Sequence, residues 1–304
     1  MNVLCGAICI AKKIGTKAYA EERLNMKDDF RLQREDYTDP VCPFCTDDYQ
    51  KNPPVRKIPT ARILEKADAF FGRNDYQGAE RLFLYWLEEA RLGKDLRGEF
   101  QIRNELMGLY RKLGRRSEAL ENATRALELI PEAELEGTVG AGTCYVNAAT
   151  VRKAFGMAKE ALPLYEKAQS IYEKYLKPDD PMLAGLSNNM ALALVDLNRY
   201  AEARRQYEKA LSIVSVTDGC EVQAAATYLN LANLTEAEQG LSDGADEIER
   251  LLSAARSFLD KPGIPHDGNY AFYCEKCAPT FDYYGHFAYA KELEARAGRI
   301  YERN

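Results

Sequence analysis

The sequence predicts an all-α fold, a solenoid of about six antiparallel helical hairpins. Three observations predict it. From residue 58 onward, apolar residues recur at steps of three and four, the period of a helix with a buried face. A small residue returns at steps of 40 to 42 residues, and Gly or Asn separates the two helical runs of each copy. A hairpin that is apolar on both faces cannot bury them alone, so the copies are expected to stack.

The clearest copy lies between residues 183 and 214. It is interpreted as two helices separated by Asn198 and Arg199, because the apolar residues on either side of this dipeptide follow the helical period. Ala191 in the first helix and Ala203 in the second are small, so they are expected where the two helices approach most closely.

The small residue early in the second helix defines the repeat. Its copies are 40, 42 and 42 residues apart, at Ala79, Ala119, Ala161 and Ala203. The matched positions of the first helices are Ala67, Met107, Ala149, Ala191 and Ala232. This alignment predicts repeats at residues 60–93, 100–133, 142–176, 184–216, 225–259 and 270–302.

The turns inside the repeats carry residues that tolerate the left-handed conformation with which helices end: Asn74, Gly114, Gly156 and Asn198. The fifth repeat has a longer predicted turn, EQGLSDG, before an irregular second helix. The sixth has Pro279 inside its first helix, which predicts a kink or a delayed helix. Divergence of this kind is typical of a terminal capping repeat.

Residues 1–57 lie outside the repeats. They contain four of the eight cysteines and an irregular stretch with Pro residues and the tetrapeptide CPFC. We expect this segment to be an N-terminal cap or extension, partly helical, that covers the exposed face of the first repeat.

The repeats resemble the tetratricopeptide repeat, with a small and an aromatic residue in the first helix, Gly or Asn at the turn, and Ala, aromatic and Ala in the second helix. Copies of 42 residues with an NNMA or LNLA core and a PDDP lead-in are similar to the longer variant of kinesin light chains and bacterial peptide-sensing regulators. The resemblance covers residues 58–302. It implies that the hairpins form a right-handed superhelix. It also implies that the protein is an interaction scaffold that binds an extended peptide in the concave groove.

In that variant an Asn of the first helix holds the backbone of the bound peptide, and the matched positions of this sequence carry Asn. Asn147, Asn189 and Asn230 each precede the aligned small residue by two positions, and Asn104 lies one position earlier in the second repeat. A side-chain amide offers a donor and an acceptor, so it can pair with any peptide group. The alternative is that these amides bond the neighbouring helix and tie the repeats together.

Two further matched pairs surround the amides on the predicted face: Arg111 with Lys153, and Tyr145 with Tyr228. Positive charge at the first pair favours an acidic peptide. The first repeat instead has the acidic residues Glu65 and Asp68, so the groove is expected to use the middle repeats.

Charge and hydropathy narrow the range of partners. The formal net charge is −6 and no extended basic patch offsets it, so we expect no nucleic acid and no anionic membrane as partner. No apolar run reaches 18 residues, so no transmembrane helix is expected. Residues 1–10 lack the basic start and cleavage site of a secretory signal. The sequence therefore predicts a cytoplasmic protein whose partner is a protein or peptide segment.

Two CxxC units are present, Cys42 with Cys45 and Cys274 with Cys277, and four thiolates can form a tetrahedral zinc site. Predicted helices separate the two pairs, so we expect buried thiols and no cofactor. The alternative function is a zinc-dependent assembly module, in which the CxxC pairs join chains and the N-terminal segment occupies the groove. The sequence lacks GxSxG, HExxH and phosphate-loop motifs, so no enzymatic activity is expected.

Overall fold

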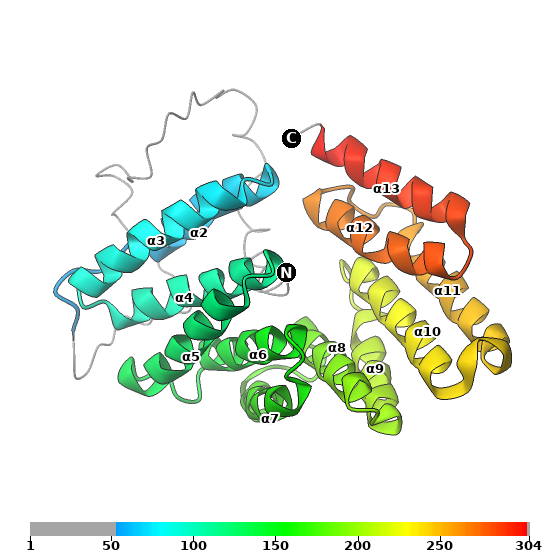
Figure 1. Ribbon diagram of the computed structural model, residues 1–304, viewed down its shortest axis with the longest axis horizontal. Helices are drawn as coiled ribbons and strands as arrows, with labels where there is room; N and C mark the ends of the chain where they lie inside the picture. The colour runs from blue at the N-terminus through cyan, green and yellow to red at the C-terminus, as the bar shows by residue number, and fades with distance from the viewer. Residues whose placement is uncertain (1–52, 303–304) are drawn as a thin grey trace. The chain divides into compact units, whose positions relative to one another are not determined.

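The computed structural model describes residues 53–302, which form twelve α-helices and no β-strand (Figure 1). None of these helices combines the length and the apolar composition needed to cross a membrane. In chain order they are α2 (Thr60–Gly72), α3 (Tyr76–Leu92), α4 (Leu96–Lys112), α5 (Arg116–Glu132), α6 (Val139–Ala154), α7 (Ala158–Tyr175), α8 (Pro181–Asp196), α9 (Tyr200–Val214), α10 (Glu221–Asp243), α11 (Ala245–Leu259), α12 (Gly268–Tyr283) and α13 (Phe287–Tyr301).

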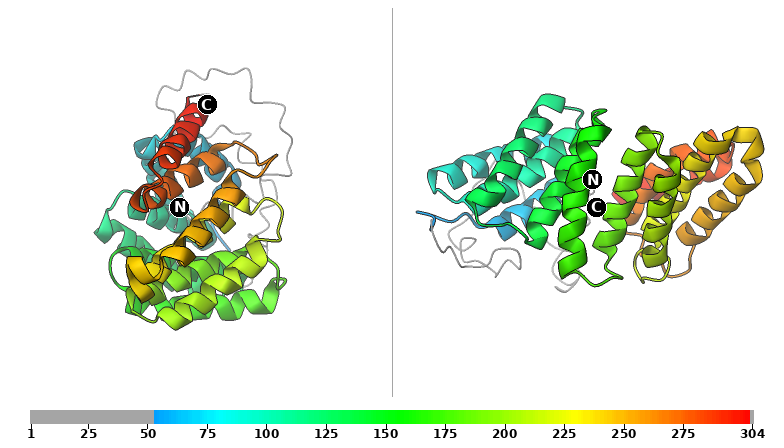
Figure 2. Two further views of the ribbon diagram at one scale, coloured as in Figure 1. Left: turned by 90° about the vertical axis from the view of Figure 1, so that its right-hand side faces the viewer. Right: turned by 90° about the horizontal axis from the view of Figure 1, so that it is seen from below.

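Contacts between helices divide the chain into two compact units, one ending at Met157 and the other beginning at Ala158. In unit 1, α2 packs on α3 and α4 packs on α5; in unit 2, the pairs are α8 with α9, α10 with α11 and α12 with α13. Successive pairs also touch, for example α3 with α4 and α9 with α10. Figure 2 shows the helices of each unit from two further sides. The prediction of an all-α fold made of stacked helical hairpins is confirmed.

The repeated small residues lie in the interior of both units. Those of the second helices have no exposed surface, and those of the first helices are at most 1% exposed. Large side chains around them are buried to the same degree, namely Phe83, Trp86, Tyr165 and Tyr207. Full burial of one such side chain stabilises the fold by about 1.5–3 kcal/mol. The first, third and fourth repeats therefore share one core arrangement, a small residue and a large aromatic residue buried in the second helix.

The turns end their helices by one recurrent geometry. Asn74, Gly114, Gly156 and Asn198 have the expected positive φ, between 56° and 77°. In each case the next residue donates its N–H, at 2.9 Å, to the carbonyl five residues before it. This is the Schellman bond, which satisfies a carbonyl at the helix end. Lys94 has the same geometry at the turn between two pairs, although it is neither Gly nor Asn.

Side-chain caps fix where several helices begin. Asp75, Asp95, Thr138, Asp180 and Asp267 each accept a backbone N–H from the first turn of the helix that follows. Asp95 has a second role, because its other carboxylate oxygen accepts the N–H of Ile58 at 2.9 Å. The residues just before α2 are thereby held against the turn between α3 and α4. The predicted N-terminal cap lies almost wholly outside the described residues.

The last two pairs differ from the sequence expectation. The turn expected at EQGLSDG is present, because the helical run of α10 is interrupted at Gly240, whose φ of 81° and ψ of 167° only Gly adopts readily. The second helix of this pair, α11, is regular. The delay expected from Pro279 was also wrong, since α12 begins at Gly268. Pro279 lies on the exposed side of α12, where water can satisfy the carbonyl that lacks a helical donor.

Replacing Ala191 with Leu is expected to destabilise the protein by about 1–3 kcal/mol, because the added carbons have no space to occupy. Ala191 has no exposed surface, and its helix, α8, packs against both α7 and α9. Urea denaturation followed by circular dichroism measures the change. Ala201→Leu, on the exposed side of α9, is the matched control and should leave the midpoint unchanged. An equal midpoint for the two variants would show that Ala191 is not at a close helix contact.

Candidate protein-binding wall of the first helices

The first helices of successive pairs contact one another and form a wall in each unit. We call this the first-helix wall: α2, α4 and α6 in unit 1, and α8, α10 and α12 in unit 2. Within unit 1, α4 touches both α2 and α6; within unit 2, α10 touches both α8 and α12. Side chains at one register of these helices are therefore neighbours in space, as an extended ligand would require.

In unit 1 the structure brings two predicted amides together. The Nδ2 group of Asn147 on α6 donates to Oδ1 of Asn104 on α4 at 3.4 Å, and Asn104 donates to the Phe100 carbonyl at 3.0 Å. Both side chains are buried, with 3% and 5% of the residue exposed. This bond matches the alternative in which amides tie neighbouring repeats. Each amide retains further donor or acceptor capacity beyond these bonds.

In unit 2 the amides differ in exposure. Asn189 on α8 is 4% exposed, whereas Asn230 on α10 is half-buried. Asn230 donates to Oδ1 of Asn188 at 3.1 Å, again between neighbouring first helices. Asn188 was missed by the sequence analysis, although it directly precedes a predicted site residue. Asn230 is thus the predicted amide with the most access to solvent.

The four other predicted residues are all half-buried on first helices. Arg111 and Lys153 lie near the ends of α4 and α6 in unit 1, and each interacts with neighbouring groups. Burial is the main cause that raises the pKa of Tyr145. Tyr228 stacks on Phe258 of the paired helix α11, with 5.7 Å between ring centroids and 27° between planes. One face of Tyr228 is therefore occupied within the hairpin.

Two carboxylates on the wall helices of unit 1 have clearly raised pKa values. Glu105 on α4 occupies the register of the predicted amides, two residues before Met107, and the sequence analysis missed it. Burial, followed by repulsion from Asp68 on α2, raises the pKa of Glu105 to about 8. Burial, followed by repulsion from Glu65, raises the pKa of Asp68 to about 6. The strict repeat alignment was the signal that identifies Glu105.

The wall of unit 2 carries a tyrosine cluster at the α10–α12 contact. The hydroxyl of Tyr284 donates to Glu236 at 2.8 Å and lies 3.1 Å from Oδ1 of Asn233, and Tyr283 donates to the same carboxylate at 2.6 Å. Tyr283 is 62% exposed. These bonds fix α12 on α10, the helix that carries Asn230, and they leave the Tyr283 ring exposed beside it.

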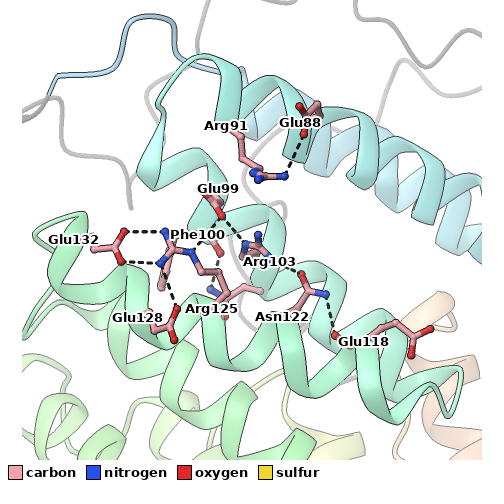
Figure 3. A network of polar contacts seen from close by, with 11 residues as sticks. Glu88, Arg91, Glu99, Phe100, Arg103, Glu118, Asn122, Arg125, Glu128 and Glu132 are labelled. Carbon is pink, nitrogen blue, oxygen red and sulfur yellow. Dashed lines mark hydrogen bonds and ion pairs between the residues drawn. The ribbon is translucent and has the colours of Figure 1, made fainter.

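A polar network holds α4, and with it Asn104 and Glu105, on its partner α5 (Figure 3). Arg103 donates to Glu99 at 2.7 Å and to Asn122 of α5 at 3.1 Å. The network continues through Arg125, whose guanidinium forms two bonds to Glu132, at 2.7 and 2.8 Å. Paired bonds between guanidinium and carboxylate groups fix orientation as well as distance.

The C-terminal CxxC unit lies in the core. Cys274 and Cys277 are at most 1% exposed, and burial raises the pKa of these thiols to about 11 and about 12. Protonated thiols are poor metal ligands. No group of three metal-binding side chains occurs within residues 53–302. Cys42 and Cys45 lie outside the described residues, so the four-cysteine zinc site stays a prediction.

Comparison with known proteins adds the identity of the repeats. Residues 98–174 and 183–214 match two profiles described as the tetratricopeptide repeat. Curated relatives are clustered mitochondria protein homologs: that of Aspergillus clavatus is 28% identical and that of Aspergillus oryzae 27% identical, each over 169 residues. The match covers 55% of this chain and 13% of each relative, so this chain spans a small part of their length.

Solved structures with a similar arrangement of helices include kinesin light chain TPR-like repeats of Podosopora anserina, with 19% identity and a TM-score of 0.48. That alignment covers 66% of this chain and 94% of the other. The apo form of RapI has 15% identity and a TM-score of 0.49, with 81% and 100% covered. The two profile matches identify residues 98–174 and 183–214 as tetratricopeptide repeats, and both ranges lie within the paired helices of the fold.

Proposed function

We propose that the protein is a non-catalytic interaction scaffold that holds extended segments of partner protein along the first-helix wall of each unit. The tetratricopeptide-repeat fold supports the scaffold function. The observation that carries the finer proposal is the recurrence of Asn147, Asn189 and Asn230 at one register of helices that contact their neighbours within each unit.

Amides that bond each other can still bind a ligand. An Asn side chain has two donors and an acceptor with two lone pairs, and the bond between Asn230 and Asn188 uses one donor of Asn230. A peptide backbone presents alternating N–H and C=O groups, which match this capacity whatever its side chains are. In the proposed complex the eight wall residues have two kinds of role: amide contacts from Asn104, Asn147, Asn189 and Asn230, and surrounding contacts from Arg111, Lys153, Tyr145 and Tyr228.

Asn230→Ala is expected to weaken peptide binding about 2- to 12-fold, the equivalent of one hydrogen bond of about 0.5–1.5 kcal/mol. The probe is a peptide selected on the full chain from a displayed random library, and its affinity is measured by fluorescence anisotropy. Asn147→Ala should lower the thermal midpoint more than Asn230→Ala does, because it leaves the buried Oδ1 of Asn104 without its donor.

Replacing Asn147, Asn189 and Asn230 together should nearly abolish binding. Gln77→Ala removes an exposed amide from the second helix α3 and should change neither affinity nor stability. If the triple variant bound the selected peptides as tightly as the wild type, the amides would serve only as ties between repeats, and the proposal would be wrong.

A further inference from the structure

Away from the first-helix wall, the end of unit 2 contains a cavity of about 550 Å³. Its lining comes from the end of α11, the loop that follows it and the last turns of α13. A cavity of this volume is in the range that holds small-molecule ligands. Apolar side chains supply part of its surface, namely Leu259, Pro262, Ile264 and Ile300.

The charged lining is mostly cationic. Lys261, Arg296 and Arg299 line the cavity, against one carboxylate, Asp260. The C-terminal ends of α11 and α13 also lie there, and each contributes about half a negative charge. Carboxylates outside the lining also pair with two of the cations, Glu221 with Lys261 and Glu292 with Arg296, which leaves Arg299 as the lining cation without an ion pair in the described residues. The lining therefore favours a ligand with a single anionic group.

Existing contacts show which cation is available to that group. Lys261 bonds Glu221 at 2.8 Å, and Arg296 bonds Asp260 at 2.7 Å and the Tyr270 hydroxyl at 2.8 Å. Arg299 is exposed and has no hydrogen bond or ion pair with any residue in the part of the chain that the structure describes. Its guanidinium can offer two parallel N–H groups to a carboxylate or a phosphate.

The other recognition group is aromatic. His266 lines the same cavity and stacks on Tyr270, with 4.4 Å between ring centroids and 14° between planes. Tyr270 is only 1% exposed and donates to the Leu259 carbonyl at 3.1 Å. The imidazole of His266 is thus supported from the protein side, and its ring suits contact with a flat or apolar part of a ligand.

We propose that this cavity binds a small organic anion with one acidic group, a carboxylate or a phosphate monoester, attached to an aromatic or apolar group. Arg299 binds the anion, and His266 with the apolar lining binds the rest. This site is separate from the first-helix wall and does not depend on the function proposed for it.

Isothermal titration calorimetry of the full chain with benzoate and with phenyl phosphate tests the proposal. The ligand that binds more tightly shows whether the site prefers a carboxylate or a phosphate group. At least one should bind with a dissociation constant in the millimolar range or below, whereas phenol and inorganic phosphate should each bind at least about tenfold more weakly. Arg299→Gln should weaken binding of the aryl anion about tenfold or more, because a charge-assisted pair is lost. His266→Ala should weaken it as well.

Lys291→Gln removes an exposed positive charge from α13 outside the cavity and is the matched control, with unchanged affinity expected. Arg299 is exposed and unbonded in the described chain, so Arg299→Gln should keep the wild-type circular dichroism spectrum and thermal midpoint. The proposal is overturned if neither aryl anion binds at concentrations of about 10 mM, or if the wild type and Arg299→Gln bind with equal affinity.

Discussion

Trp86→Ala is expected to destabilise the protein by about 3–5 kcal/mol, which is a large share of the stability of an ordinary domain. Trp86 lies on α3, has no exposed surface and packs edge-on to Tyr85, with 5.2 Å between ring centroids. Truncation removes the largest side chain of the unit 1 core. The interior is close-packed, so neighbouring groups refill the space only in part.

Guanidinium denaturation followed by far-ultraviolet circular dichroism measures this effect. Tryptophan fluorescence is unsuitable because Trp86 is the sole Trp of the chain. Leu84→Ala is the matched control: Leu84 is on the same helix but 45% exposed, so its loss should change the midpoint little. A similar, small shift for both variants would contradict the burial of Trp86 and with it the placement of the second helix in the first repeat.

Glu105→Gln is expected to stabilise the protein at alkaline pH and to flatten the dependence of stability on pH. The pKa of Glu105 is raised to about 8 in the folded protein, above its ordinary value of 4.5. Between these two values the folded chain holds a proton that the unfolded chain has released. Stability therefore falls as pH rises from about 4.5 to about 8, and it stays low above that range.

The wild-type thermal midpoint should thus fall between pH 5 and pH 8.5, and the variant should lose less over the same interval. At pH 5 the two proteins should have similar midpoints, because Glu105 is then protonated and resembles Gln. At pH 8.5 the variant should melt several degrees higher, since each unit of pKa shift corresponds to about 1.4 kcal/mol.

Glu88→Gln is the control for this series. It removes a carboxylate of the same unit from an exposed pair with Arg91, where little stability is at stake. Its pH dependence should follow the wild type. If Glu105→Gln and Glu88→Gln had parallel profiles, Glu105 would have to be ionised in the folded protein at neutral pH.

The fold followed from the sequence because its signals are local and repeated. The fourth repeat shows this: Asn198 was predicted as the turn residue and has a positive φ, and Ala203 was predicted at a close helix contact and is fully buried. The positive φ of Lys94 had no signal in the sequence, because Lys does not favour the left-handed conformation as Gly and Asn do. Gly240 lies in a segment predicted as a turn, and its positive φ interrupts the helical run there.

The candidate site was less accessible to sequence reasoning. Recurrence identified Asn147 and Asn230, but not whether an amide faces a ligand or its neighbour, because that depends on distances across helices. The structure shows that Asn147 bonds Asn104 and that Asn230 bonds Asn188, in each case across two first helices. The cavity beside Arg299 had no sequence signal at all, since it depends on how a non-repetitive loop closes over the end of α13.

The repeated interior has a consequence for how such a chain can change during evolution. The first four pairs share a buried small residue at one position of the second helix, for instance Ala119 and Ala203, and so offer similar surfaces to their neighbours. Loss or duplication of one whole pair joins surfaces of the same kind, so the chain can lengthen or shorten by about 42 residues at a time and still fold. Loss of half a pair joins unlike helices. Relatives should therefore differ in length by whole hairpins, and their insertions and deletions should begin and end between pairs.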